Sequence, residues 1–543
     1  MKQFKQLILS ALFICFVFVA IAQQQSKSEK KRTFNDAKHF LLLSNYTAAL
    51  PLLIRLQRAD TSNANYNYLV GLCYLNNSLE KEKAIAYFKS ASKNIAEKYK
   101  ELNFKENKAP YKTMYHIGES YHFIYQFDKA ENYFTKYKEL VFNNTKEKQL
   151  ADRFIDICKN GTLLTKDSVE ITIENLGPNI NSEFDEHTPC ITADEKTMVF
   201  TSRRRGNTGG TLTDDGKYFE DIYISKKING AWCYPEKISK NINTNGHEAT
   251  IGISADGQEL FIYKDDYGIG NIYISQFKEN DWTVPEKLGS NISTKANETH
   301  ATLSSNGTTL IFTSDRGNGK GGKDLYIVHR NPTGEWGLAQ NMGDILNTQY
   351  DEEGPFLHPD GSTLYFSSKG HNSMGGYDLF YSELQPDGSW GAPKNMGYPI
   401  NTTAEEVYYV LSADGKRAYF SSVREDGLGG RDIYVMNLLS LPERSSTVIT
   451  GTVKMEGNAE VPKNIAINVK EAKTGKIVGS YKPNKETGNY VIILKQGKDY
   501  IFTCETPEYI FSPERISIPD KTAFKEINKP IVLSPIGVVK KKQ

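Results

Sequence analysis

Five glutamates recur at one position of a repeated sequence unit. Each stands eight residues before an Asp or Asn at a turn, and the five are Glu186, Glu248, Glu298, Glu352 and Glu406. Carboxylates can act as general acids or bases and can bind cations. Catalysis by carboxylates needs different roles for different members of the set, whereas here the same residue recurs in every unit. The pattern therefore has two interpretations: the glutamates form a charged binding ring, or they have a structural role.

The glutamates belong to a tandem repeat between residues 169 and 440. In each unit the turn joins two runs of alternating apolar residues, which is typical of a β-hairpin. A third strand then opens with a phrase such as GGKDLYIV (321–328), GGYDLFYS (375–382) or GGRDIYVM (429–436), and in four units a tryptophan opens a fourth strand. The turn residues are Asp194, Asp256, Asn306, Asp360 and Asp414. A four-stranded unit of about 50 residues in tandem predicts the blades of a β-propeller.

The repeated phrase and the ends of the array indicate how the blades would join. We expect the glycines of the phrase to give the connection backbone freedom, and its Asp to accept a hydrogen bond from nearby backbone. The last unit has no tryptophan-containing fourth strand, while residues 176–182 match the end of another unit's fourth strand. Residues 169–176 are therefore predicted to pair near Ile433 and to close five blades into a ring. A sixth, degenerate blade is the alternative.

Both roles stay open for the repeated glutamates. Because they precede the innermost strand, their carboxylates would face one mouth of the central channel. Like charges about 8 Å apart repel by about 2 kcal/mol at an effective dielectric near 20, so a ring would need a cation or a basic ligand. Cross-strand ion pairs are the alternative, and we favour them. In a two-residue hairpin the residues opposite are Arg203, Asp265, Asp315, Lys369 and Val423, with Arg316 and Arg424 one step further.

Motifs for other chemistry are weak. The stretch GNGKGGKD (317–324) is close to a phosphate-binding loop, but Asp324 replaces Ser/Thr and a strand follows. No G-x-S-x-G or H-E-x-x-H occurs, and no cysteine lies in a C-x-x-C pair. Buried cysteines are favoured over a bridge between Cys190 and Cys233. We therefore predict no enzyme, no metal and no cofactor; a glycan-binding or glycan-hydrolysing propeller that uses the glutamates is the alternative.

Residues 33–165 show a helical spacing that repeats. Gly71, Ala84 and Phe88 recur as Gly118, Ala130 and Phe134. The small residues would let two helices approach closely while the aromatic ring fills the space beside them. These intervals resemble the tetratricopeptide repeat, with residues 94–113 as an insertion. The resemblance implies a groove that binds peptides or proteins; docking on a neighbouring domain is the alternative.

The two ends of the chain differ from its middle. Residues 1–22 carry two lysines, an apolar run and Ala20-Ile21-Ala22, the layout of a cleaved signal peptide, and the run is short for a membrane anchor. Residues 446–538 show short alternating strands and glycine-containing turns, which predict a small β-sandwich. The sandwich resembles the carboxypeptidase regulatory-like domain, with landmarks at Gly451, Gly475, Gly488 and Gly497.

The repeat units resemble the TolB-type (WD40-like) propeller, most clearly in HPDGSTLYFSS and GGYDLFYS. The order of signal peptide, helical repeats, propeller and sandwich resembles the periplasmic part of OmpA-family proteins, including one associated with type IX secretion. The sequence ends at SPIGVVKKKQ, so the resemblance does not extend to a peptidoglycan-binding OmpA-type domain.

These resemblances lead to a functional expectation. The chain has 66 Lys+Arg against 65 Asp+Glu, and this balance gives no basis for binding nucleic acid. We expect a multidomain α plus all-β protein that is exported to the periplasm, with no membrane span after signal cleavage; association with the outer membrane is left open. Its expected role is a non-enzymatic scaffold for outer-membrane or secretion-complex proteins.

Overall fold

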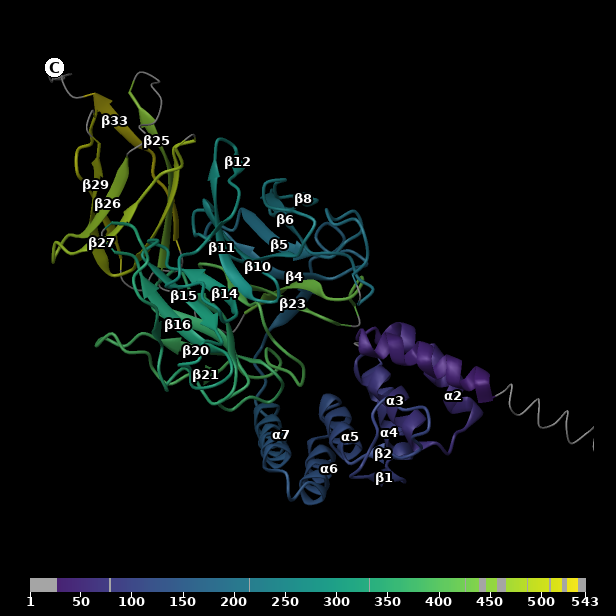
Figure 1. The fold of residues 1–543 in the computed structure, drawn as a ribbon. Helices are drawn as coiled ribbons and strands as arrows, with labels where there is room; N and C mark the ends of the chain where they lie inside the picture. The colour runs from purple at the N-terminus through teal and green to yellow at the C-terminus, as the bar shows by residue number, and fades with distance from the viewer. Residues whose placement is uncertain are drawn as a thin grey trace, which may run out of the picture. The chain divides into compact units, whose positions relative to one another are not determined.

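The computed structural model describes residues 27–77, 80–213, 215–331, 333–424, 426–438, 446–456, 465–485, 487–506, 509–519 and 525–535. The predicted signal peptide, residues 1–22, lies outside these ranges. The chain forms two compact units, one of residues 1–162 with 212–216 and one of residues 163–211 with 217–543. The first is helical and the second is almost entirely β (Figure 1). Within the described ranges no helix is both long and apolar enough to cross a membrane.

The first unit consists of helices that pack in pairs. Residues 27–42 are helical, and they are followed by α2 (Tyr46–Ala59), α3 (Ala64–Leu75), η1 (Lys81–Lys83), α4 (Ala84–Ala91), α5 (Lys112–Phe123), α6 (Phe127–Leu140) and α7 (Thr145–Leu164). A short parallel pair, β1 (Ile95–Ala96) and β2 (Ala109–Pro110), lies in the predicted insertion.

Close packing of these pairs depends on two glycines. A Cβ atom at Gly71 of α3 would lie 2.6 Å from the ring of Phe88 in α4, and one at Gly118 of α5 would lie 2.7 Å from the ring of Phe134 in α6. Both phenylalanines are fully buried. The predicted use of small residues beside an aromatic ring is therefore confirmed for both pairs.

The second unit begins with five antiparallel sheets of one design. In each, a hairpin is followed by a third and a short fourth strand in sequence order, except in the last. The strands are β4 (Glu186–Ile191), β5 (Thr197–Ser202), β6 (Asp221–Ile228), β7 (Ala231–Trp232) and β8 (Glu236–Lys237); β9 (Glu248–Ile253), β10 (Glu259–Asp265), β11 (Gly270–Lys278), β12 (Asp281–Trp282) and β13 (Glu286–Lys287); β14 (Glu298–Leu303), β15 (Thr309–Ser314), β16 (Asp324–His329) and β17 (Gln340–Asn341); β18 (Glu352–Leu357), β19 (Thr363–Ser368), β20 (Asp378–Glu383) and β21 (Lys394–Asn395); and β22 (Val410–Leu411), β23 (Arg417–Ser422) and β24 (Asp432–Asn437).

The fourth strand of the last sheet comes from upstream of the first sheet. Strand β3 (Thr172–Asn175) pairs antiparallel with β24, with Asn175 opposite Tyr434. The backbone N–H of Leu176 also donates to the carbonyl of Ile433. The pairing predicted for residues 169–176 is thus confirmed. The N–H of Glu186 in β4 also donates to the carbonyl of Arg431, just before β24, and this bond links the first and last sheets.

Apolar side chains of neighbouring sheets share common cores. The second strand of every sheet carries a phenylalanine that is at most 3% exposed: Phe200, Phe261, Phe312, Phe366 and Phe420. Phe261 of one sheet packs in the same cluster as Ala301 and Phe312 of the next. A buried aromatic side chain contributes roughly 2–3 kcal/mol through the hydrophobic effect, so these shared cores are a large source of cohesion between the sheets.

The repeated GG-x-D phrase has a steric explanation. Asp324 accepts a hydrogen bond from the N–H of Gly321 (3.0 Å), and Asp378 accepts one from Gly375 (2.9 Å), so the predicted backbone capping is confirmed. The predicted backbone freedom is wrong, because these glycines do not have a left-handed φ. Instead, a Cβ at Gly321 would lie 1.8 Å from the carbonyl oxygen of Tyr350.

The same close approach recurs along the array. A Cβ at Gly375 would lie 2.3 Å from the carbonyl oxygen of Thr402, and one at Gly429 would lie 2.3 Å from the backbone of Glu183. In each case the neighbouring backbone belongs to the segment that leads into the next sheet, and for Gly429 the next sheet is the first. The phrase is repeated because each sheet must admit the backbone of its neighbour.

The C-terminal part of this unit has two further sheets. One contains β25 (Ser446–Met455), β28 (Asn489–Lys495), β30 (Tyr509–Ile510), β32 (Lys525–Asn528) and β33 (Ile531–Pro535), and the other contains β26 (Ala466–Glu471), β27 (Ile477–Tyr481), β29 (Lys498–Glu505) and β31 (Glu514–Ile518). A single apolar cluster, which includes Ile467, Ile492 and Phe502, contains residues of both sheets. The five described cysteines are free, and Cys190 is buried.

Candidate functional site

The five repeated glutamates are buried side chains. Four are 0% exposed and Glu406 is 8% exposed. Each carboxylate accepts hydrogen bonds from the backbone N–H and the hydroxyl of a Ser or Thr four residues earlier, with N···O distances of 2.8–3.1 Å. These residues are Ser182, Thr244, Thr294, Thr348 and Thr402. The glutamates therefore hold the turn that precedes the inner strand. A Ser or Thr four residues before every glutamate is visible in the sequence and could have indicated this.

A second set of donors comes from the neighbouring strand of the same sheet. The hydroxyls of Ser202, Ser314 and Ser368 donate to Glu186, Glu298 and Glu352 at 2.6–3.0 Å, and Lys264 Nζ lies 3.1 Å from Glu248. In these four sheets the residue opposite the glutamate is one position earlier than predicted. The predicted partners Arg203, Asp265, Asp315 and Lys369 are therefore wrong, because a β-bulge adds one residue to the inner hairpin.

Ion pairs to the glutamates come from arginines two residues beyond the opposing serine. Arg204 Nη2 lies 3.1 Å from Glu186, and Arg316 Nη2 lies 3.2 Å from Glu298. Each guanidinium also stacks on a tyrosine, 4.6 Å from the Tyr223 centroid for Arg204 and 4.7 Å from the Tyr326 centroid for Arg316. The sequence pattern had indicated Arg316 but missed Arg204. In the fourth sheet Gly370 takes this position, so Glu352 has no arginine there.

Burial raises the pKa values of Glu352 and Glu406 by different amounts. Burial raises the pKa of Glu352 to about 7, with a further contribution from the charge of Asp324. Burial likewise raises the pKa of Glu406 to about 8, with Asp378 adding to the effect. A carboxyl group that binds its proton more tightly in the folded state stabilises the fold below its unfolded pKa and loses that effect as the pH rises through the folded pKa.

Replacing Glu352 with glutamine is expected to flatten the pH dependence of stability. Between pH 5.5 and 8 the wild-type carboxyl should lose about 2 kcal/mol of stabilisation, since one pKa unit corresponds to about 1.4 kcal/mol. The amide does not titrate, so the variant should lose less over the same range. Urea unfolding followed by tryptophan fluorescence reports on these sheets, because Trp232 and Trp282 lie in their strands and Trp336 and Trp390 form bridges to Arg330 and Leu384, directly after the third strands. An unchanged slope in the variant would show that Glu352 does not titrate in this range.

A different group of polar side chains gathers beside the starts of the inner strands. The two oxygens of Glu220 lie 3.3 Å from His187 Nε2 and 3.2 Å from His247 Nδ1. Burial opposes ionisation of Glu220, but hydrogen bonds from both histidines lower its pKa well below the usual range. Glu220 comes from the segment before β6, whereas His187 lies in β4 and His247 directly precedes β9.

A similar arrangement surrounds Glu353. His300 Nδ1 and Lys323 Nζ lie 3.3 and 2.6 Å from the same carboxylate oxygen. Burial opposes ionisation here too, but His300 and Lys323 lower the pKa of Glu353 strongly. The ring of Tyr408 links the two arrangements, with centroids 6.0 Å from His187 and 5.0 Å from His300. We call His187, Glu220, His247, His300, Lys323, Glu353 and Tyr408 the histidine–glutamate cluster.

Sequence reasoning missed this cluster entirely. Its members come from all five units. His187 and Glu353 directly follow a repeated glutamate, and His300 and Tyr408 stand two residues after one, but the residue types differ from unit to unit, so no common motif marks them. Tyr408 and Thr188 take left-handed backbone conformations (φ 63° and 51°) at the position where the fourth sheet has Gly354. Non-glycine residues in this region cost about 1–2 kcal/mol and are concentrated at functional sites. The side chain at this position is therefore a candidate for selection by function.

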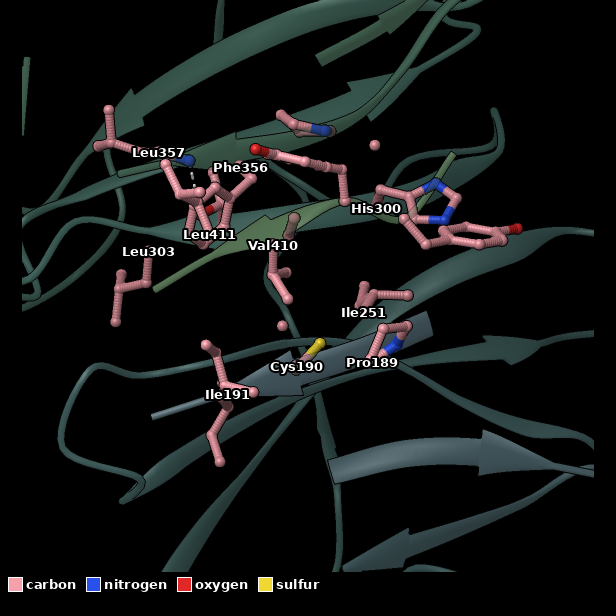
Figure 2. A pocket seen from close by; sticks show the side chains of 18 of the residues that line it. Pro189, Cys190, Ile191, Ile251, His300, Leu303, Phe356, Leu357, Val410 and Leu411 are labelled. Atoms are coloured by element: carbon pink, nitrogen blue, oxygen red, sulfur yellow. Dashed lines mark hydrogen bonds between the residues drawn. The ribbon is translucent and has the colours of Figure 1, made fainter. Parts of the chain in front are cut away.

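A cavity of about 60 Å³ adjoins the cluster and is lined by the inner strands of all five sheets. Figure 2 shows Cys190, Ile251 and Val410 around it, with His300 at one side. Tyr408 also lines it. Its volume would hold roughly four water molecules. Among the described residues no group of three or more His, Cys, Asp or Glu side chains could hold a metal ion.

Comparison with known proteins gives likeness of fold only. No protein-family model and no curated protein matches the chain. TolB from Acinetobacter baumannii is 14% identical over 54% of this chain and 72% of its own, with a TM-score of 0.32. An alpha-L-arabinofuranosidase from Lactobacillus brevis is 16% identical over 50% of this chain and 93% of its own, with a TM-score of 0.31. At such identities the likeness does not extend to activity.

Proposed function

We propose that the chain is a non-enzymatic scaffold of the bacterial cell envelope. It would combine tetratricopeptide-like helices, a closed five-bladed TolB-type propeller and a carboxypeptidase regulatory-like sandwich. The observation that carries the proposal is that the glutamates that recur in every unit are buried and accept hydrogen bonds within the protein. They stabilise the turns of the repeat, which leaves the surfaces of the array to bind partners.

The alternative, a glycan-acting propeller, would need glutamates that reach a ligand. Glu298 is 0% exposed, and its carboxylate accepts from Thr294, Ser314 and Arg316. A buried carboxylate with four donors is poorly placed to exchange a proton with a sugar outside.

The histidine–glutamate cluster is better suited to binding than to acid catalysis. A glycosidase acid must hold its proton near neutral pH, which requires a raised pKa. In the cluster the pKa values of Glu220 and Glu353 are lowered, so both carboxylates stay ionised. Together with the partly exposed Tyr408 and His247, they present fixed charges and ring faces to a polar ligand.

The proposed location is the periplasm, with secretion-complex or outer-membrane proteins as partners. It depends on the predicted signal peptide at residues 1–22 and on the resemblance to envelope proteins. Cell fractionation after expression of the full chain would place the mature protein, and N-terminal sequencing would show whether cleavage follows Ala22.

Crosslinking in intact cells is expected to capture specific envelope proteins on the full chain. After solubilisation and affinity purification, the same partners should return in replicate and disappear without crosslinker or with an unrelated periplasmic bait. Recovery of the chain alone would count against a scaffold.

Assays on a polysaccharide panel distinguish the alternative. We expect neither hydrolysis nor binding by the wild type, and no change from Glu298→Gln beyond lower stability. Hydrolysis that is abolished by Glu298→Gln in a folded variant would establish the glycan-acting function instead.

A further inference from the structure

Tyrosines and lysines form a continuous strip on the helical unit. Tyr74 of α3 stacks on Tyr87 of α4 (centroids 5.5 Å apart, planes 20° apart), and Tyr121 of α5 stacks on Tyr133 of α6 (5.7 Å, 18°). The two stacks occupy equivalent places in successive helix pairs. We call Tyr74, Lys83, Tyr87, Lys89, Tyr121, Lys129, Tyr133 and Lys136 the lysine–tyrosine strip.

The lysines of the strip lie over its rings. Lys89 of α4 and Lys129 of α6 are 5.2 and 5.4 Å from the centroid of Tyr121, and Lys136 is 5.0 Å from that of Tyr133. Lys89 therefore links one helix pair to the next. All three lysines are exposed. Lys83, 5.9 Å from the Tyr74 centroid, also forms an ion pair with Glu80, and Lys129 Nζ donates to Gln126 Oε1 at 2.7 Å.

This geometry prepares the ammonium groups for binding. A lysine loses side-chain entropy when a ligand immobilises it. Contact with a ring face restricts the side chain beforehand, which reduces this loss. Rows of fixed positive charge favour an anionic ligand, which would gain charge-assisted hydrogen bonds from the lysines and from tyrosine hydroxyls.

We propose that the lysine–tyrosine strip binds an acidic, extended segment of a partner protein. The choice of a protein as the partner rests on the proposed scaffold function, whereas the acidic character rests on the charge of the strip. The strip runs across two helix pairs, so a segment rich in Asp and Glu could follow it and meet Lys89, Lys129 and Lys136 in turn. Electrostatic complementarity of this kind sets specificity and association rate.

Other anionic partners fit the strip less well. A membrane surface is bound by a face that also inserts large apolar side chains. The exposed apolar residues of this unit, such as Leu42 and Phe142, lie outside the strip, and its own tyrosines are at least partly covered. An acidic peptide needs only the charges and hydroxyl groups that the strip presents.

The test is binding of a labelled peptide rich in Glu and Asp to the full chain, followed by fluorescence anisotropy. The wild type should bind, and raising the salt from about 0.05 to 0.5 M should weaken binding because exposed charges are screened. The triple variant Lys89→Glu, Lys129→Glu and Lys136→Glu should bind at least about tenfold more weakly, because each replacement removes an attractive charge and adds a repulsive one. Arginine at the same three positions should retain binding.

A matched control reverses three lysines of α7, which lie outside the strip: Lys146→Glu, Lys148→Glu and Lys159→Glu. This variant has the same net charge as the strip variant and should bind like the wild type. Equal loss in both variants, or no binding by the wild type, would overturn the proposal. Binding to vesicles with anionic lipid but not to the peptide would overturn it in favour of a membrane surface. If envelope partners still co-purify with the strip variant, the scaffold function stands and only this inference fails.

Discussion

Replacing Gly321 with alanine is expected to destabilise the five sheets by at least about 4 kcal/mol. The new Cβ would lie 1.8 Å from the carbonyl oxygen of Tyr350 and 2.8 Å from that of Thr348. Both atoms belong to backbone, so no side-chain rotation can relieve the overlap. Losses of this size are exceptional for a single methyl group and indicate a specific steric conflict.

The loop that contains Gly321 also supplies the control. Gly317 has no atom within 4 Å of the position of a Cβ, and its φ is not left-handed. Gly317→Ala should therefore leave stability within about 0.5 kcal/mol of the wild type, or raise it slightly by restricting the unfolded chain. Urea unfolding followed by tryptophan fluorescence measures both variants. Equal, small effects at both positions would show that the neighbouring backbone does not lie against Gly321.

The strand pattern of the sheets was predictable because it depends on local sequence. Alternating apolar residues and Asp-Gly turns specify the hairpins, and the third strands do begin at residues such as Asp324 and Asp378. The pairing of β3 with β24 could be inferred because the sequence before the first unit matches the end of a fourth strand. Hydrophobic period and turn chemistry act over a few residues, so one sequence is enough to read them.

The cross-strand partners of the glutamates and the histidine–glutamate cluster were not predictable for a related reason. A β-bulge inserts one residue without disturbing the alternation that marks the strand. It therefore shifts the partner of Glu186 from Arg203 to Ser202, and the sequence pattern does not reveal this shift. The contact of His300 with Glu353 joins two different sheets. Such contacts depend on how sheets pack against each other, which no local spacing encodes.

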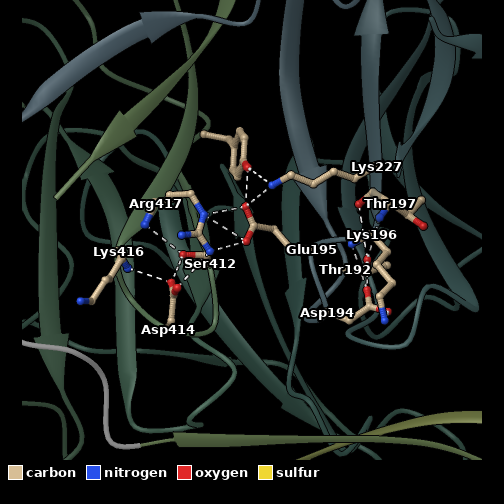
Figure 3. Close-up of polar contacts among 11 residues, drawn as sticks. Thr192, Asp194, Glu195, Lys196, Thr197, Lys227, Ser412, Asp414, Lys416 and Arg417 are labelled. Carbon is tan, nitrogen blue, oxygen red and sulfur yellow. Dashed lines mark hydrogen bonds and ion pairs between the residues drawn. The ribbon is translucent and has the colours of Figure 1, made fainter. Parts of the chain in front are cut away.

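A second substitution with a large expected effect on stability lies at the contact between the first and last sheets. Glu195 lies in the hairpin turn between β4 and β5, and Figure 3 shows its carboxylate between Arg417 of β23 and Lys227 of β6. Arg417 Nη2 is 2.6 Å and Lys227 Nζ is 3.0 Å from the carboxylate, and the Tyr419 hydroxyl also donates to it. Burial opposes ionisation of Glu195, but the hydrogen bonds from Arg417 and Tyr419 lower its pKa.

The backbone conformation at this turn is unfavourable for a glutamate. Glu195 has a φ of 54°, in the left-handed region, and the equivalent residues of the other four turns are glycines with positive φ: Gly257, Gly307, Gly361 and Gly415. A non-glycine residue costs about 1–2 kcal/mol in this conformation. The ion pairs must therefore outweigh the backbone strain for the glutamate to be favourable here.

Replacing Glu195 with alanine is expected to destabilise the sheets by about 3 kcal/mol at neutral pH. It removes the shared acceptor of Arg417, Lys227 and Tyr419 but keeps the strained backbone. Glu195→Gly should cost about 1 kcal/mol less, because glycine relieves the strain. Glu259→Ala is the matched control, since Glu259 pairs with Arg330 of a neighbouring sheet at 3.3 Å but its turn has a glycine.

Acid should remove the difference between Glu195→Ala and the wild type. A group with a lowered folded pKa stabilises the fold above its unfolded pKa, and the effect is lost as the pH falls through the folded pKa.

Hydrogen exchange should show where Glu195→Ala weakens the fold, with faster exchange at β3 and β24 than in the middle sheets. If Glu195→Gly is less stable than Glu195→Ala, strain at this turn is not what distinguishes it. If exchange rises equally in all five sheets, Glu195 does not hold the first and last sheets together.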